Sequence, residues 1–285
     1  MTGPIVDIHP HIVSTDTKRY PLAPLFGIQS DWSKERTASV EELLAAMDEA
    51  GVAKTAIVHA STCYGFDNSL VGDTVARFPQ RCTAVGSIDM LAPDAVDVAK
   101  HWIARGVTGF RIFTGGSTKS VDASTLDDAR SYPVWELCGE RAIPICVQTD
   151  ASGIPPTIAL AKRFPKASII VDHFARPDVS GGPPYAKAAP LMSLAALPNV
   201  YLKLTPVALD RIRQAKADTH VFLAKLVAEF GAARIAWGSN WPNSPGTLKE
   251  HVMAARAALA SLSEPDRDAI LGGTALRLYP TLSNT

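Results

Sequence analysis

Short apolar runs alternate with helical patterns along the whole chain of 285 residues, and this alternation limits the possible folds more than any other feature. Eight of the runs are rich in β-branched residues and mix few polar positions among the apolar ones, which is typical of parallel strands covered on both faces. The expected strands are Ile5–Ile8, Thr55–His59, Thr83–Ile88, Gly109–Phe113, Pro144–Gln148, Ser168–Asp172, Val200–Leu204 and Arg234–Trp237.

Amphipathic segments fill the gaps between these strands. Val40–Ala50 is one of them, and Gly51 provides its stop signal. The other expected helices are Asp94–Arg105, Val134–Arg141, Ile154–Arg163, Asp218–Phe230, Leu248–Leu262 and Glu264–Leu271, the last capped by Ser263. Alternating strands and helices predict parallel βαβ units, and no GxGxxG follows a strand to favour a dinucleotide fold. Eight units predict an α/β protein with a (β/α)8 TIM barrel, which typically takes about 250 residues, so residues 1–285 are expected to form one barrel domain.

The charge balance and the cysteines restrict the class of partner and the compartment. Lys plus Arg equals Asp plus Glu at 28 each, so the chain lacks the strong field that attracts nucleic acid or an anionic membrane. No apolar stretch is long enough for a membrane span, and no signal peptide is expected. The four cysteines show no CxxC pair, which favours a reducing, cytoplasmic compartment. A small molecule is the expected partner, and a homo-oligomer remains open.

Two long segments without an obvious secondary structure follow strand ends. Pro10–Ser39 follows the first strand and holds Phe26 and Trp32, and Asp178–Leu197 follows the sixth. Long loops of this kind are often lids or binding loops. Both lie on the face where barrel enzymes carry their chemistry.

Polar side chains stand at or just after the carboxyl ends of the expected strands, which meet at one mouth of a barrel. Four of the seven histidines are among them. The set comprises His9, His11, His59, Ser61, Asp89, Arg111, Gln148, Asp150, His173, Lys203 and Asn240. The remaining histidines, His101, His220 and His251, fall on helices and are expected at the surface.

His9-Pro10-His11 is the strongest local signal. Residues two apart on a strand point to the same side, so both imidazoles can face one point inside the mouth. Neutral imidazoles placed in this way bind a metal or polarise a carbonyl oxygen. His173 ends the sixth strand and is expected to share the site, whereas Asp172 points to the other side of the pleat and is expected to support it.

Arg111 and Lys203 are cations that point into the same mouth and need anionic partners, because an unpaired buried charge is costly. A substrate carboxylate or sulfonate, held bidentately by the arginine, is one such partner. An internal salt bridge from Arg111 to Asp89 or Asp150 is the other. A lysine inside a barrel can also act as an amine nucleophile, which we rank below charge neutralisation.

Five segments together resemble the amidohydrolase superfamily, and more narrowly its lactonase branch of 2-pyrone-4,6-dicarboxylate lactonase, sugar lactonases and 4-sulfomuconolactone hydrolase. They are Val6-Asp7-Ile8-His9-Pro10-His11, His59-Ala60-Ser61-Thr62-Cys63-Tyr64-Gly65-Phe66-Asp67-Asn68, Gly109-Phe110-Arg111, Asp172-His173-Phe174-Ala175-Arg176-Pro177 and Trp237-Gly238-Ser239-Asn240-Trp241-Pro242. Each segment is weak alone, but their order along residues 6 to 242 is specific.

The resemblance implies an enzyme that opens a cyclic ester. His9, His11 and His173 would hold the lactone carbonyl, either directly or through one Zn²⁺ ion. Arginine and hydroxyl side chains would grip the acid groups of the substrate. The residues expected to bind substrate are Arg111, Lys203, Ser61, Thr62, Tyr64 and Gln148.

The chain departs from the family pattern after the eighth strand. The usual Gly-Ser/Thr-Asp-Trp/Phe-Pro is here Gly238-Ser239-Asn240-Trp241-Pro242, and an amide cannot accept a proton from water. Three interpretations stay open: Asn240 orients the water while a histidine takes its proton, the residue is a substitution that traps a complex, or the chain is a weak or inactive relative. Gln148 is likewise neutral where many metal-dependent relatives place a ligand, so at most one metal is expected.

The sequence therefore predicts a carboxylic-ester hydrolase that opens a small anionic lactone in aromatic-compound or sugar-acid catabolism. A lactone similar to 4-sulfomuconolactone or to a pyrone dicarboxylate is the expected substrate. One alternative is a Zn²⁺-dependent decarboxylase of an aromatic acid on the same fold. The other is a non-catalytic binder of small acids. Asn240 favours this alternative, because its amide cannot act as the base.

Overall fold

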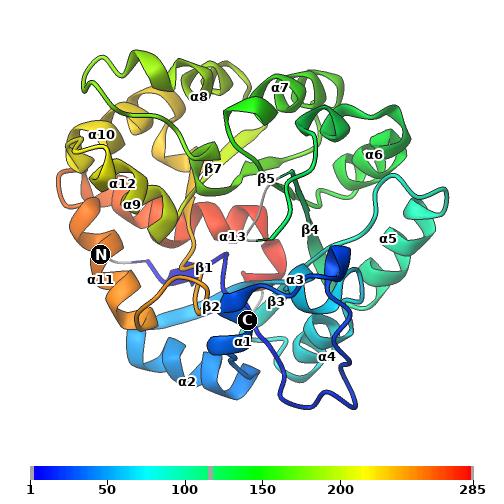
Figure 1. Cartoon of the computed structure of the whole chain (residues 1–285). Coiled ribbons are helices and arrows are strands. Elements are labelled where there is room, and N and C mark those ends of the chain that lie inside the picture. The colour runs from blue at the N-terminus through cyan, green and yellow to red at the C-terminus, as the bar shows by residue number, and fades with distance from the viewer. Residues whose placement is uncertain (1–2, 115–117, 284–285) are drawn as a thin grey trace.

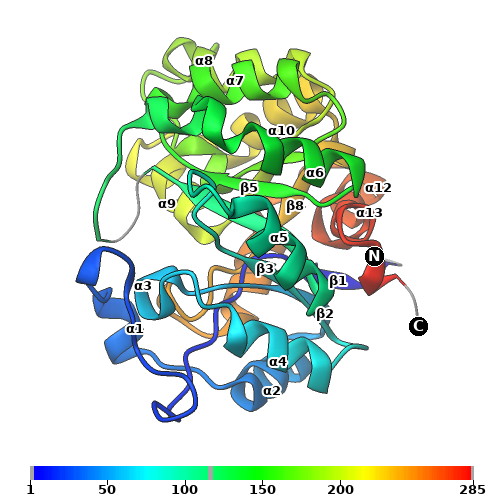
Figure 2. The same cartoon turned by 90° about the vertical axis from the view of Figure 1, so that its right-hand side faces the viewer.

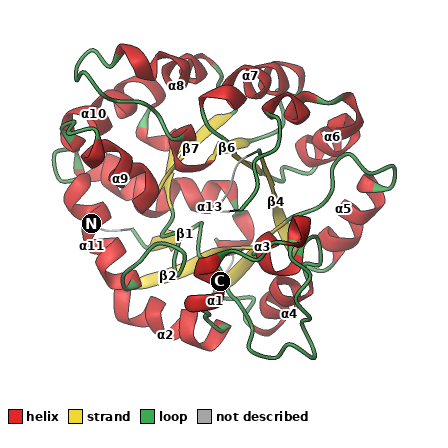
Figure 3. Cartoon of the chain, in the orientation of Figure 1, coloured by secondary structure: helices red, strands yellow, loops and turns green. Residues whose placement is uncertain are grey.

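Eight parallel strands form a nearly closed barrel in the computed structural model, which describes residues 3–114 and 118–283 (Figures 1 and 3). Each strand pairs with its neighbours in sequence order, and the ends of the sheet meet where the N–H of Ile8 donates to the carbonyl of Trp237 at 3.2 Å. The strands are β1 (Ile5–Asp7), β2 (Val52–Val58), β3 (Cys82–Gly86), β4 (Val107–Phe113), β5 (Ile145–Gln148), β6 (Ile169–Val171), β7 (Val200–Leu204) and β8 (Ile235–Trp237). The predicted (β/α)8 barrel is confirmed.

Helices surround the strands as an outer ring (Figure 3). They are α1 (Asp31–Glu35), α2 (Val40–Ala50), α3 (Ser61–Tyr64), α4 (Ser69–Arg77), α5 (Ala95–Ala104), α6 (Tyr132–Glu140), α7 (Ile154–Arg163), α8 (Ala189–Ser193), α9 (Pro206–Gln214), α10 (Thr219–Phe230), α11 (Leu248–Ala258), α12 (Glu264–Asp268) and α13 (Thr274–Leu278). None of the helices in the described ranges has the length and apolarity that a membrane crossing requires.

The helices depart from the expected ones mainly where they are short. α4 and α9 were not predicted, and the two long loops contain α1 and α8, because a helix of one to three turns gives little periodicity in the sequence. The last predicted helix, Glu264–Leu271, comprises α12 and the start of a π-helical turn, Ala269–Gly273, and α13 beyond it was not predicted. His251, expected at the surface, is only 7% exposed, because α11 turns this side chain inward to the carbonyl of Ser244, 3.3 Å away.

Two apolar clusters hold the barrel together. The larger lies between the strands and the surrounding helices. The smaller fills the barrel itself, with Val6, Val85 and Ile170 among its members, and includes Tyr279 just after α13. Figure 2 places α13 and both chain ends at the end of the barrel opposite α1 and α3. Tyr279 therefore closes one end, and the other end is open to the loops that follow the strands.

A buried carboxylate joins the open ends of the first and last strands. Asp7 Oδ1 accepts the N–H of His9 at 2.9 Å and the N–H of Ser239 at 2.8 Å. Between these two segments, a Cβ added to Gly238 would lie 2.5 Å from the Cβ of His9. The chain thus needs glycine at 238 to bring the end of β8 against His9.

We predict that Gly238→Ala lowers the free energy of unfolding by about 1–3 kcal/mol, since the added methyl group overpacks a rigid junction. Thermal unfolding should show a fall in Tm of several degrees. Gly273→Ala is the matched control, because its backbone is helical and its added Cβ would meet only ordinary contacts at 3.6 Å or more. Equal Tm values for Gly238→Ala and the unchanged chain would contradict the prediction.

Candidate active site

A polar pocket of about 130 Å³ lies at the open mouth of the barrel. Of the residues predicted for the site, it is lined by His11, Ser61, Thr62, Arg111, Gln148, His173 and Asn240. No Asp or Glu is among the described residues that line it. The pocket thus presents imidazoles, amides, hydroxyls and guanidinium groups without a carboxylate.

Three of the predicted residues do not line this pocket. Tyr64 is buried at the end of the turn that Ser61 begins, and its hydroxyl oxygen accepts the N–H of Ser14 at 2.9 Å. His9 and Lys203 are fully buried inside the barrel. Both side chains therefore lie behind the residues that line the pocket, not among them.

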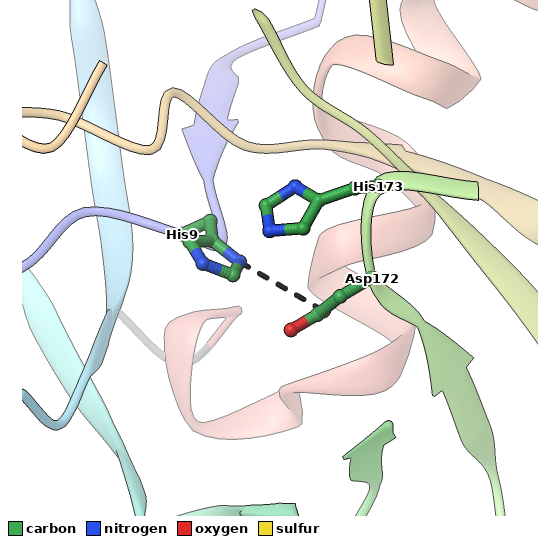
Figure 4. A group of neighbouring side chains, drawn as sticks. All are labelled: His9, Asp172 and His173. Carbon is green, nitrogen blue, oxygen red and sulfur yellow. Dashed lines mark ion pairs between the residues drawn. The ribbon is translucent and has the colours of Figure 1, made fainter. Parts of the chain in front are cut away.

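Lys203 ion-pairs with Asp172 rather than standing free for a substrate anion. Its ammonium nitrogen is 2.7 Å from Asp172 Oδ1, 3.0 Å from His9 Nδ1 and 3.3 Å from the sulfur of Cys146. Asp172 therefore does more than the supporting role expected of it. Figure 4 shows its carboxylate together with His9 and His173 at the ends of β6 and β1.

The contacts of Lys203 and of the backbone fix how two imidazoles carry their protons. An ammonium group can only donate, so His9 Nδ1 accepts from Lys203 and the hydrogen of a neutral His9 is on Nε2. That Nε2 is buried without a hydrogen-bond partner among the described residues. His11 Nδ1 lies 2.8 Å from the carbonyl of Val58 and must donate to it, which leaves a lone pair on Nε2. One imidazole is thus a donor and the other an acceptor.

Burial keeps these imidazoles neutral. It lowers the pKa of His11 and of His173 to about 3, and it lowers the pKa of His9 well below the usual value. The positive charges of Lys203 and Arg111 act in the same direction. Burial opposes ionisation of Asp172, but the same two cations outweigh it and hold the pKa of that carboxyl well below its usual range.

Arg111 has an internal partner and also reaches the pocket. Its Nε donates to Asp172 Oδ2 at 2.8 Å, so the salt bridge is formed with Asp172 and not with Asp89 or Asp150. The side chain is 10% exposed and lines the pocket, which leaves its other N–H groups available to a ligand.

Arg176 also lines the pocket, although the sequence did not single it out. It is the last of four consecutive residues in the left-handed region, which begins with His173 at φ 54° and ends with Arg176 at φ 51°. Such residues cost about 1–2 kcal/mol each. This turn brings His173 and Arg176 to the same cavity. In the sequence, the only sign that Arg176 belongs to the site is its position three residues after His173.

Asn240 is 2% exposed and its amide is held in place. Its Nδ2 donates to Ser244 Oγ at 2.9 Å, and Asn243 Nδ2 approaches its Oδ1 at 3.4 Å. The backbone of Asn240 is left-handed at φ 54°, which asparagine and aspartate tolerate better than most residues. An aspartate could therefore occupy the same position.

His9, Asp172 and His173 form the group of possible metal ligands in the described ranges, with one ligand atom from each within 4.8 Å of the others. Lys203 already contacts Asp172 Oδ1 and His9 Nδ1, and Arg111 contacts Asp172 Oδ2. The donor types suit a divalent cation, but the ammonium group already occupies Asp172 Oδ1 and His9 Nδ1, two of the atoms that these residues offer. A metal therefore fits at these atoms only where the ammonium has left.

Residues 6–281 match the family model described as amidohydrolase. The chain belongs to the amidohydrolase family. L-fucono-1,5-lactonase from Burkholderia ambifaria is 27% identical over 292 residues, which cover 96% of this chain and 94% of that protein. 4-Sulfomuconolactone hydrolase from Rhizobium radiobacter is 30% identical over 212 residues, which cover 72% of this chain and 66% of that protein.

Three solved structures share the fold. A putative 2-pyrone-4,6-dicarboxylic acid hydrolase from Pseudomonas putida has a TM-score of 0.77, 23% identity and 99% coverage of both chains. A zinc-bound amidohydrolase from Burkholderia multivorans has a TM-score of 0.76 and 22% identity, covering 97% of this chain and 99% of its own. A 2,6-dihydroxybenzoate decarboxylase from Rhizobium has a TM-score of 0.70 and 16% identity, covering 98% and 99%. The barrel alone therefore does not define the reaction.

We predict that the free energy of unfolding falls as the pH drops from 7.5 to 5. His11, His59 and His173 have pKa values lowered to about 3, 4 and 3 by burial, so below pH 6.5 the unfolded chain binds protons that the folded chain does not. Each contributes a loss on the order of 1–2 kcal/mol at pH 5. Burial raises the pKa of Asp7 to about 6, which opposes the trend by about 1 kcal/mol.

Urea unfolding at pH 7.5, 6 and 5 measures this dependence. His59→Gln should flatten it, because the amide can still donate to the carbonyl of Gly65, 3.0 Å from His59 Nε2, but cannot titrate. His101→Gln, at an exposed position, is the matched control and should keep the original slope. Stability that stays constant from pH 7.5 to 5 would show that the imidazoles are protonated in the folded chain.

Proposed function

We propose that this protein hydrolyses a small lactone that carries a carboxylate or another anionic group. The observation that carries the proposal is the pocket itself, where neutral imidazoles and two arginines converge at the mouth of an amidohydrolase barrel. Relatives named as lactone hydrolases support the reaction class. A lactone has a carbonyl that imidazoles can polarise, and its acid group matches the guanidinium groups.

Each pocket residue has a role in this proposal. Arg111 and Arg176 bind the anionic group of the substrate and fix the orientation of the ring. His9 is buried behind the lining, where it supports the pocket imidazoles that polarise the carbonyl oxygen as negative charge develops there. His173, held through Nδ1 by Thr205 Oγ1 at 2.7 Å, lies beside His9 with 5.1 Å between ring centres and assists in this polarisation.

Water must be activated without a carboxylate in the described lining. The amide of Asn240 positions the water, and the Nε2 lone pair of His11 accepts its proton. The water oxygen bonds to the carbonyl carbon, the ring C–O bond breaks, and the leaving oxygen takes up a proton to give a hydroxy acid. Since burial lowers the pKa of His11 to about 3, this imidazole is a weak base and we expect slow turnover.

We predict that Asn240→Asp raises kcat by about 10²-fold, because it places a carboxylate base beside the water position. His173→Ala should lower kcat/KM by about 10²-fold, because it removes part of the polarisation. Proton release from γ- and δ-lactones, both anionic and neutral, measures the rates. Hydrolysis that is unchanged in His173→Ala would overturn the proposal.

Arg176→Met tests how the substrate anion is bound. It should raise KM for anionic lactones and leave neutral lactones unaffected, whereas Arg256→Met, at an exposed position on α11, changes neither.

Tight lactone binding with turnover only in Asn240→Asp would instead identify a binding protein. Carbon dioxide release from aromatic acids would identify a decarboxylase.

The role of Zn²⁺ is tested separately by its content in the purified protein. We predict well below one equivalent in the unchanged chain, because Lys203 and Arg111 already pair with Asp172, the carboxylate of the group. Lys203→Met should bind zinc more tightly, since Asp172 loses its ammonium partner. Lys225→Met, which removes an ion pair on the surface of α10, is the matched control. One equivalent of zinc in the unchanged chain would contradict this prediction.

A further inference from the structure

A second cavity adjoins the catalytic pocket at the end of β4. It measures about 370 Å³, compared with about 130 Å³ for the catalytic pocket. Arg111 and Phe113 line both cavities. Ligand sites typically hold about 300–1,000 Å³, so the catalytic pocket alone is small for a complete substrate. We call the second cavity the side chamber.

The walls of the side chamber are mainly apolar. Ile88 and Met90 follow β3, Ile112 belongs to β4, and Val121 and Leu126 come from the segment after β4. Ile88, Met90 and Leu126 are buried. A chamber with this lining favours hydrocarbon over a charged or strongly hydrated group.

Few polar side chains among the described residues face the side chamber. Apart from Arg111, they come from Asp89, Thr125 and Ser131. The carboxylate of Asp89 accepts the N–H of Leu91 at 3.0 Å, and the hydroxyls of Thr125 and Ser131 donate to backbone carbonyls. The two hydroxyls are thus engaged within the protein, and Asp89, which is exposed, is tied to the backbone through Oδ1.

Two exposed aromatic side chains form the rim. Phe26 is 44% exposed and Phe66 is 36% exposed, and both line the side chamber. The backbone of Phe26 is left-handed at φ 61°, which is costly for a bulky residue and is typical of binding sites. Phe26 is held edge-on to Phe113 with 6.5 Å between ring centres, and Lys119 Nζ lies 5.0 Å from its ring. The chain thus keeps apolar surface exposed at the entrance.

We propose that the side chamber binds an apolar arm of the substrate, an alkyl chain or aryl group carried by the lactone. This inference rests on the proposed function and narrows its substrate class. The anionic ring lies in the catalytic pocket, and the arm passes Phe113 into the side chamber. Because Phe113 and Arg111 border both spaces, the arm must leave the ring on the β4 side.

A series of γ-butyrolactone carboxylates with alkyl substituents from methyl to hexyl tests the proposal. kcat/KM should rise about fourfold per methylene, the factor that corresponds to ~0.8 kcal/mol, until the chamber is full. Val121→Glu should abolish this length dependence by placing a charge on the chamber wall. Phe66→Ser, at the exposed rim, should weaken it. Val221→Glu, 44% exposed on α10, is the matched control and should keep the original dependence.

Binding of straight-chain carboxylates from acetate to decanoate, measured by calorimetry, separates this inference from the proposed function. Affinity should increase with chain length in the unchanged chain and lose this dependence in Val121→Glu. That outcome supports the side chamber even if no lactone is hydrolysed. Absence of lactone hydrolysis would refute only the proposed function. If hydrolysis and binding were both independent of chain length, the proposed role of the side chamber would be wrong. The proposed function would not be affected.

Discussion

The ion pair between Lys203 and Asp172 is the interaction on which the rest of the site depends. Both groups are fully buried, so each would be very costly without the other. The same ammonium group sets the proton position of His9, and the same carboxylate holds Arg111 at the pocket wall. In the proposed function, one interior charge pair thus fixes an imidazole behind the pocket wall and holds a cation for the substrate anion.

For the lactone hydrolysis that we propose, this arrangement would let a pocket without a carboxylate in its described lining bind and polarise an ester. A carboxylate at the surface of the pocket would repel an anionic ligand, whereas Asp172 lies beneath the surface and is paired with two cations. The pocket therefore faces the ligand with neutral rings and positive groups. The weak point is proton removal from water, because the imidazoles that remain neutral through burial are weak bases.

The barrel could be predicted from the sequence because parallel strands read as continuous apolar runs, and each expected strand overlaps an observed one. Strand ends also placed His11, His173 and Asn240 at one mouth, since barrel topology brings those ends together. The depth of Lys203 and its pairing with Asp172 could not be predicted, because they depend on how far each side chain lies below the mouth in three dimensions.

Other features escaped prediction because they depend on local backbone geometry or on distant segments. Arg176 reaches the pocket through a left-handed turn that contains no glycine or asparagine to signal it in the sequence. The side chamber combines Phe26, Phe66 and Leu126, which are far apart in the chain and are individually unremarkable apolar residues. A sequence pattern shows which residues are apolar, but not which of them surround an empty volume.

The closure of the barrel by Tyr279 has a consequence for the order in which the chain can mature during synthesis. Tyr279 packs against the interior cluster from the far end, where its hydroxyl lies 3.8 Å from Cys146 Sγ, and Cys146 in turn contacts Lys203. All eight strands leave the ribosome before this residue does. Lys203 and Asp172 can therefore be shielded from water on this side of the barrel only once Tyr279 is in place.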